Sequence, residues 1–252
     1  MADSTLNPAC CARTAVVTGT YTPKGAYEEI AGLNTYTTGP TTSTHAIILI
    51  YDVFGLTSQT IQGADRLAAA TSALVLVPDF FKGEPIDQDV FPMDTDEKKA
   101  RATKFMTTKA DFREAVSAVL AVRKEAEEKF SRVESWGAFG LCWGGKVTAL
   151  ISGEGTLFKA AGTAHPGRLA TEEAERMMIP YCCLFSKEDG TPEQMDAYTK
   201  ALKNNGQDNL VERYSNMHHG WMGARANLED EDNVKEYEKG YDQVASFFKK
   251  HL

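Results

Sequence analysis

The residues best placed to do chemistry lie around one cysteine, in the run Gly140-Leu-Cys142-Trp-Gly144. A glycine two positions before the cysteine and another two positions after it form the cysteine version of the strand-turn-helix motif G-x-S-x-G. The turn is sharp, and Cβ atoms at the two glycine positions would collide with the adjoining strand and helix. The turn would place the Cys142 sulfur at a helix N-terminus, whose dipole favours thiolate. The N–H of Trp143 would then face a developing oxyanion.

Two other interpretations of this turn compete with a nucleophile. Cys142 could be a buried structural thiol, which is the usual environment of a cysteine that forms no disulfide. Alternatively, Gly140 to Lys146 match the first seven positions of the phosphate-binding loop G-x-x-x-x-G-K-[ST]. The next residue is Val147, however, where that loop requires a Ser or Thr hydroxyl for magnesium. Nucleotide binding is therefore the weakest of the three interpretations.

An acid and a histidine after later apolar runs favour the nucleophile. In a sheet that carries this turn, the chain order is nucleophile, acid, histidine. Asp189 follows the run 181–185 and lies in a turn marked by glycine and proline. His219 follows the run 210–214, and the glycine after it leaves the chain free to turn the imidazole toward the sulfur; His218 is the second candidate. The remaining histidines have no comparable support: His45, His165 and His251.

The segments that must position these residues alternate between short apolar runs and longer amphipathic stretches. We expect strands at 45–52, 74–77, 135–139, 158–163, 181–185 and 210–214. Helices are expected at 58–72, with Ser58 as N-cap, at 109–130, at 143–151 and around 234–248, where apolar residues recur at three- and four-residue steps. This alternation predicts an α/β fold with a mostly parallel central sheet and helices on both faces. Residues 1–252 are expected to form one domain without a separate lid, and residues 1–40 an antiparallel lead-in.

Composition excludes several classes of protein. The chain has 252 residues, 42% hydrophobic and 25% charged, which is typical of a globular chain with a sizeable core. Its net charge of −8 argues against nucleic acid or an anionic membrane as partner. No apolar run approaches the ~18 residues of a membrane span, and no secretory signal is evident, so we expect a cytoplasmic protein.

The cysteine count is odd, and four of the cysteines are sequence neighbours in pairs, which indicates thiols in a reducing compartment rather than a disulfide framework. No C-x-x-C pair or matching histidine spacing supports a zinc site, so no metal is expected. The cysteines are Cys10, Cys11, Cys142, Cys182 and Cys183.

Taken together, these motifs resemble the dienelactone hydrolase family of α/β-hydrolases, in its eukaryotic branch. The resemblance extends from Ile47 to about Arg225. It rests on four segments: Asp52-Val-Phe-Gly55, Pro78-Asp-Phe-Phe81, Gly140-Leu-Cys-Trp-Gly-Gly145 and His219-Gly-Trp221. The resemblance implies an α/β-hydrolase fold and a triad of Cys142, His219 and Asp189. It also implies a hydrolase without metal or cofactor that cleaves a small ester or lactone through an acyl-thioester.

The same resemblance implies how the oxyanion would be held. The donors would be the N–H groups of Trp143 and Val53. In the family a glutamate precedes the second of these donors and pairs with the resting nucleophile. Here that position is Asp52, one methylene shorter. The other interpretation of Asp52 is a capping or turn acid after a strand.

Substrate contacts follow less directly from the resemblance. The family uses arginines to hold the carboxylate of its lactone, and Arg225 and Lys82 are the candidates here, although a lysine offers a point charge instead of a bidentate fork. Phe54, Trp143 and Trp221 would line the entrance or belong to the core. With the second arginine missing, the alternative function is a non-catalytic ligand-binding or regulatory protein on the same fold.

Overall fold

The core of the protein is one eight-stranded sheet, described here from a computed structural model that covers residues 9, 12–16 and 19–252. The strand order is β1-β2-β4-β3-β5-β6-β7-β8. The strands are β1 (Ala26–Ile30), β2 (Leu33–Thr38), β3 (His45–Ile50), β4 (Leu74–Pro78), β5 (Ser135–Leu141), β6 (Ala160–Ala164), β7 (Tyr181–Ser186) and β8 (Leu210–Tyr214). Strands β3 to β8 are parallel, whereas β1 and β2 form an antiparallel hairpin whose second strand pairs with β4.

The hairpin confirms an antiparallel lead-in over part of its predicted range. Ala31 and Gly32 join its strands, with φ of +52° and +71°. Two consecutive positive φ values give a tight turn whose twist matches that of the strands it connects. The lead-in strands lie within 26–38; Cys10 and Cys11, also assigned to the lead-in, lie outside the described residues.

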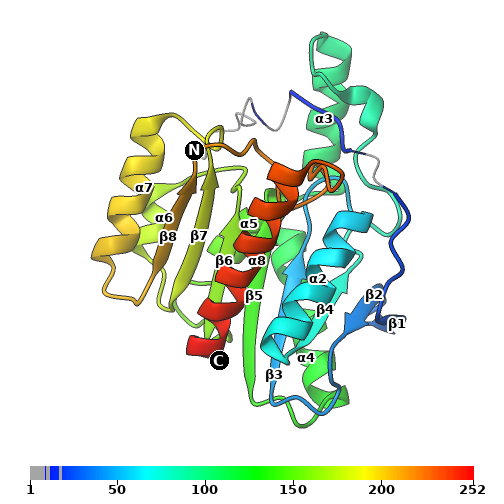
Figure 1. Cartoon of the computed structure of the whole chain (residues 1–252), viewed down its shortest axis with the longest axis vertical. Coiled ribbons are helices and arrows are strands. Elements are labelled where there is room, and N and C mark those ends of the chain that lie inside the picture. The colour runs from blue at the N-terminus through cyan, green and yellow to red at the C-terminus, as the bar shows by residue number, and fades with distance from the viewer. Residues whose placement is uncertain (1–8, 10–11, 17–18) are drawn as a thin grey trace.

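Helices cover both faces of the sheet, as expected for parallel strands buried on both sides. On one face α2 (Ser58–Thr71) and α8 (Glu231–His251) pack side by side, in front of the sheet in Figure 1. On the other face α4 (Phe112–Lys129) contacts α5 (Trp143–Leu150), and α6 (Thr171–Glu175) and α7 (Pro192–Asn204) continue the layer. A short 3-10 helix η1 (Gln88–Val90) and α3 (Asp96–Thr108) extend beyond the end of the sheet (Figure 1). The predicted fold class is therefore confirmed.

Several predicted boundaries were wrong by a few residues, for local reasons. The N-cap of α2 is Thr57, and Ser58 is already helical. The helix expected at 109–130 begins at 112 because the Asp111 side chain accepts hydrogen bonds from the N–H groups of Arg113 and Glu114. The strand expected at 158–163 runs from Ala160 to Ala164.

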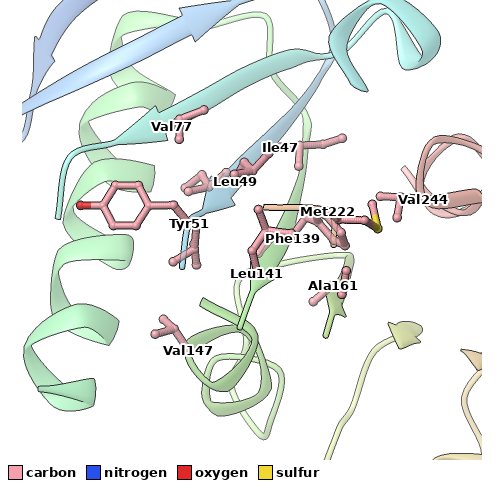
Figure 2. Packing of buried hydrophobic residues seen from close by; sticks show 14 of the residues in the cluster. Ile47, Leu49, Tyr51, Val77, Phe139, Leu141, Val147, Ala161, Met222 and Val244 are labelled. Atoms are coloured by element: carbon pink, nitrogen blue, oxygen red, sulfur yellow. The ribbon is translucent and has the colours of Figure 1, made fainter. Parts of the chain in front are cut away.

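The buried cluster explains why the apolar runs predicted strands well. Ile47 and Leu49 of β3 and Phe139 of β5 are completely buried. Figure 2 shows them between Val147 of α5 and Val244 of α8, so that the strands contact a helix layer on each face. No helix in the described part of the chain is long and apolar enough to cross a membrane.

Candidate active site

Cys142 occupies the turn between β5 and α5 in a strained backbone conformation. Its φ is +52° and its ψ is −103°, a region that residues with a Cβ rarely adopt. A Cβ atom at Gly140 would lie 2.1 Å from the carbonyl oxygen of Gly144, and one at Gly144 would lie 2.1 Å from that of Ile50. The two glycines are thus required by close backbone approach, as the motif predicts.

The sheet brings four chemistry-bearing side chains to one edge. Cys142 follows β5, His165 follows β6, Asp189 comes three residues after β7, and His219 comes five residues after β8. These strands are adjacent and parallel, so that their carboxyl ends meet at the same edge. Cys142 and His219 are 77 positions apart in the chain, but the strands that carry them are only three strand spacings apart in the sheet.

Cys142, His219 and Asp189 form a connected set. The His219 Nε2 atom lies 3.2 Å from the Cys142 Sγ atom, and its Nδ1 atom lies 2.7 Å from Asp189 Oδ1. All three residues are buried, with exposed fractions of 5%, 2% and 2%. The structure thus brings together the three residues that the sequence singles out, and it places His219, not His218, between the sulfur and the carboxylate.

The Asp189 carboxylate is fixed by its own strand end. Its Oδ2 atom accepts a hydrogen bond from the Ser186 N–H at 2.5 Å, and Oδ1 accepts one from the Ser186 hydroxyl at 2.5 Å. These contacts leave Oδ1 aimed at the imidazole. They also supply hydrogen bonds that a buried carboxylate requires.

The charges of the set favour a protonated imidazole. Burial by itself lowers the pKa of His219, but the adjacent Cys142 sulfur and the hydrogen bond to Asp189 outweigh it and raise that pKa to about 10. An imidazolium 3.2 Å from sulfur in turn favours thiolate over thiol. The arrangement therefore suits a thiolate-imidazolium pair.

The two predicted oxyanion donors belong to the turn at Cys142 and to the loop after the neighbouring strand β3. Trp143 is the first residue of α5, where backbone N–H groups have no acceptor within the helix. Val53 lies in the loop after β3, the strand next to β5, with Ile50 in register with Gly140. The Val53 carbonyl accepts a hydrogen bond from Ile86, which fixes this loop.

Asp52 has a structural role in this arrangement. Its Oδ1 atom accepts a hydrogen bond from the Phe54 N–H and its Oδ2 atom one from the Ala224 N–H, both at 2.9 Å. Burial raises the pKa of this carboxyl, while the two N–H groups and Arg225 oppose that rise. These contacts fit the interpretation of Asp52 as a turn acid better than the interpretation of Asp52 as a partner of the Cys142 sulfur.

Arg225 is not open to a substrate carboxylate here, contrary to the expectation from the resemblance. It is 3% exposed, and its guanidinium donates hydrogen bonds to the backbone carbonyls of Ala9, at 3.0 Å, and Arg13. The guanidinium also packs 5.3 Å from the ring centre of Phe54, which explains the burial of that ring. The N-terminal segment thus covers this arginine.

Three other residues of the expected substrate site lie elsewhere. Lys82 is exposed in the turn after β4, unlike the buried triad. Trp221 is fully buried against Tyr214, with ring centres 4.3 Å apart. The Trp143 ring belongs to an aromatic cluster, and its indole N–H donates to the Ala110 carbonyl. The two tryptophan side chains are core residues, and Lys82 is on the surface.

His165 is the residue that the sequence reasoning missed. Its ring is 5.3 Å from that of His219 in an edge-to-face arrangement, and the side chain is completely buried. Burial and the neighbouring His219 hold its pKa well below the usual range, so the ring is neutral. Its position directly after a buried strand was the available signal, the same one that identified Asp189.

The phosphate-loop interpretation of the turn receives no support. The Lys146 ammonium lies 2.5 Å from a carboxylate oxygen of Glu173 and is only partly exposed. Val147 is buried in the core. Within the described residues, no group of three or more His, Cys, Asp or Glu side chains is arranged to hold a metal ion.

Comparisons with known proteins identify the family of this chain. The model of the dienelactone hydrolase family matches residues 33–252. An uncharacterized AIM2 family protein from Schizosaccharomyces pombe is 36% identical over 230 residues, which cover 88% of this chain and 89% of the relative. A carboxymethylenebutenolidase homolog from Xenopus tropicalis is 24% identical over 228 residues, 87% of this chain and 89% of the relative. The crystal structure of a dienelactone hydrolase from Anabaena variabilis superposes with a TM-score of 0.64 at 13% identity, covering 92% of this chain and 98% of that one.

Proposed function

Because this chain belongs to the dienelactone hydrolase family, and membership supports a hydrolase of esters or lactones, we propose that it is a carboxylic ester hydrolase with Cys142 as nucleophile. His219 is the general base and acid, and Asp189 orients the imidazole. The substrate is a small ester or lactone, and no metal or cofactor takes part. We also propose that the protein acts in the cytoplasm.

The reaction proceeds in two acyl-transfer steps. The Cys142 thiolate attacks the carbonyl carbon, and the carbonyl oxygen becomes an oxyanion that accepts hydrogen bonds from the N–H groups of Trp143 and Val53. Collapse expels the alcohol or ring oxygen, which takes a proton from the His219 imidazolium. Water then gives a proton to His219 and attacks the acyl-thioester, releasing the acid and regenerating the thiolate. Each oxyanion donor contributes roughly 3 kcal/mol to this mechanism.

The observation that carries the proposal is the position of His219. One ring nitrogen lies 3.2 Å from the sulfur and the other 2.7 Å from the carboxylate. A structural thiol requires neither contact. Cys182, which lies in β7 and is completely buried, shows the contrast, because burial alone raises the pKa of its thiol.

The test is turnover of a small aryl ester and a lactone by matched variants. We expect Cys142→Ala to abolish turnover and Cys182→Ala to retain it. Likewise, we expect His219→Ala to be inactive and His218→Ala to be active, because the His218 ring is hydrogen-bonded to the Arg225 carbonyl instead of the sulfur. Turnover that persists in Cys142→Ala refutes the proposed nucleophile.

The alternative, a ligand-binding protein without catalysis, has a different outcome in the same assay. It predicts saturable binding of esters or lactones with no hydrolysis by the wild-type protein. The buried Arg225 is compatible with it, but a binding protein has no need of a raised pKa at His219. We therefore favour the enzyme.

A further inference from the structure

His165 lies beside the proposed nucleophile without a part in the mechanism above. Leu141 of β5 is in register with Ala164 of β6, so the next residues of the two strands, Cys142 and His165, emerge side by side. The backbone N–H of His165 is anchored to the Leu184 carbonyl at 2.8 Å. The strand ends thus place His165 beside Cys142 in the backbone, and the His165 ring contacts the ring of His219, which lies 3.2 Å from the sulfur.

The turn that begins at His165 also surrounds the nucleophile. The N–H of Gly167 donates to the Cys142 carbonyl at 3.1 Å. A Cβ atom at Gly167 would lie 3.2 Å from the Cys142 sulfur. An acyl group attached to that sulfur would therefore lie against the turn formed by residues 165–167.

The His165 imidazole has hydrogen-bonding capacity that the protein leaves unused. Neither ring nitrogen has a hydrogen-bond partner among the described residues, although the side chain is completely buried. Buried polar groups are normally paired, and an unpaired one calls for a specific explanation. The φ of +41° adds strain that a non-glycine residue rarely carries, and such strain concentrates at functional sites.

We propose that His165 is a specificity-determining residue that binds a hydroxyl group on the acyl part of the substrate, next to the scissile carbonyl; this rests on the function proposed above. A neutral imidazole offers an N–H donor on one ring nitrogen and a lone pair on the other, and a hydroxyl can pair with either, as acceptor with the first or as donor with the second. His165 stays neutral because burial and the imidazolium of His219 lower its pKa. The preferred substrates are therefore hydroxy esters or hydroxy lactones.

The test compares two matched substrates, aryl esters of butyric acid and of 2-hydroxybutyric acid, each corrected for its rate of hydrolysis by hydroxide. We expect the wild-type kcat/KM to favour the hydroxylated ester by about ten- to a hundredfold, because a site that pairs a hydroxyl discriminates against its absence. His165→Phe should reduce this preference to near one. His165→Asn should retain most of it, because asparagine tolerates a positive φ and keeps a donor and an acceptor.

A control variant and a second readout separate specificity from structure. His45→Phe makes the same substitution at the opposite end of the sheet and should leave the preference unchanged. The rate at which iodoacetamide alkylates Cys142 should be the same in wild type and His165→Phe, since the bond between His219 and the sulfur does not involve His165. Equal preference in wild type and His165→Phe, or a wild-type preference near one, overturns the proposal.

Failure of this proposal is distinguishable from failure of the proposed function. If turnover survives in Cys142→Ala, the proposed nucleophile is wrong whatever His165 does. If wild type hydrolyses neither ester, the His165 proposal is decided by calorimetric binding of α-hydroxy-γ-butyrolactone and γ-butyrolactone to the wild-type protein. Tighter binding of the hydroxylated lactone that is lost in His165→Phe supports it, and equal binding refutes it.

Discussion

Replacing Asp189 by asparagine tests the proposed charge arrangement with the smallest change in shape. The carboxylate accepts three hydrogen bonds, two from Ser186 and one from His219 Nδ1. An asparagine has one acceptor oxygen and one NH₂ donor, so it cannot satisfy the same three donors. Either its NH₂ faces the Ser186 N–H, or it faces His219 Nδ1.

The second orientation is the one we expect in the variant. The Ser186 backbone N–H cannot change its role, whereas a neutral imidazole can shift its proton from Nδ1 to Nε2. The proton then lies between Nε2 and the Cys142 sulfur, and the imidazole can no longer take a proton from the thiol. For the same change in a Ser-His-Asp triad the loss in kcat is about 10⁴-fold, and we expect a loss of at least about 10³-fold here.

The same variant should change how the reactivity of Cys142 depends on pH. In the wild type the pKa of His219 is raised to about 10, so the imidazolium persists at acid and neutral pH and maintains the thiolate. Alkylation by iodoacetamide should therefore change less than about threefold between pH 7.5 and 5.5. An ordinary thiol, with a pKa of about 8.5, loses about 100-fold over that interval, and Asp189→Asn should approach this loss.

Turnover of an aryl ester gives kcat, and mass spectrometry of the alkylated peptide gives the labelling rate. Asp196→Asn is the matched control, because it makes the same substitution at an exposed carboxylate that pairs with Arg213 on the surface. It should leave both quantities unchanged. An Asp189→Asn variant that keeps a tenth of the activity, or wild-type labelling that falls like that of an ordinary thiol, would refute the thiolate-imidazolium pair.

Two further predictions concern the structure around the site. Gly144→Ala places a Cβ atom 2.1 Å from a backbone oxygen of β3 and should lower the free energy of unfolding, measured with urea, by about 1–3 kcal/mol or more. Gly153→Ala is the control, because its Cβ atom meets only a backbone oxygen at 3.8 Å, and it should change the free energy of unfolding by less than about 1 kcal/mol. Equal effects of the two variants would contradict the close approach at Gly144. Arg225→Met leaves the carbonyls of Ala9 and Arg13 without this donor and should speed limited proteolysis within the N-terminal segment. An unchanged rate of cleavage would show that Arg225 does not hold this segment in place.

The sequence predicted the elements and residues whose signals are local. Apolar runs marked β3 to β7, because strands that are buried on both faces are apolar without alternating polar residues. The elbow at Cys142 follows from its two glycines, and Asp189 and His219 follow from their places after strands. Helix α3 gave no such signal, because Ala102 is its only fully buried residue.

Helix α7 was missed despite a signal that was present. Thr191 accepts a hydrogen bond from the Gln194 N–H, and the Gln194 side chain accepts one from the Thr191 N–H, a reciprocal capping box with proline as the first helical residue. The pattern was interpreted only as the turn that carries Asp189. One segment thus ends a strand, positions an acid and starts a helix.

The burial of the residues expected to contact substrate could not be predicted, because their environment is set by other parts of the chain. Arg225 meets carbonyl groups more than 200 positions away, and Trp221 packs on Tyr214 because Gly240 of α8 leaves room for its ring. Sequence spacing carries no information about such contacts. His165 belongs to the same class, since only the register between β5 and β6 shows that it emerges beside Cys142.

The contacts of Asp52 indicate how two loops of the proposed site are joined. Both of its oxygens are occupied by backbone N–H groups, one from its own turn and one from Ala224 in the loop that follows His219. The carboxylate therefore ties the loop after β3, which carries the Val53 N–H, to the loop that carries the imidazole. In the same arrangement the Cys142 sulfur contacts His219 and not Asp52. Asp52, which is one methylene shorter than the family's glutamate, therefore joins the two loops, and His219 is the partner of the sulfur. Any movement that separates these two loops must break the buried hydrogen bond from the Ala224 N–H to the Asp52 carboxylate.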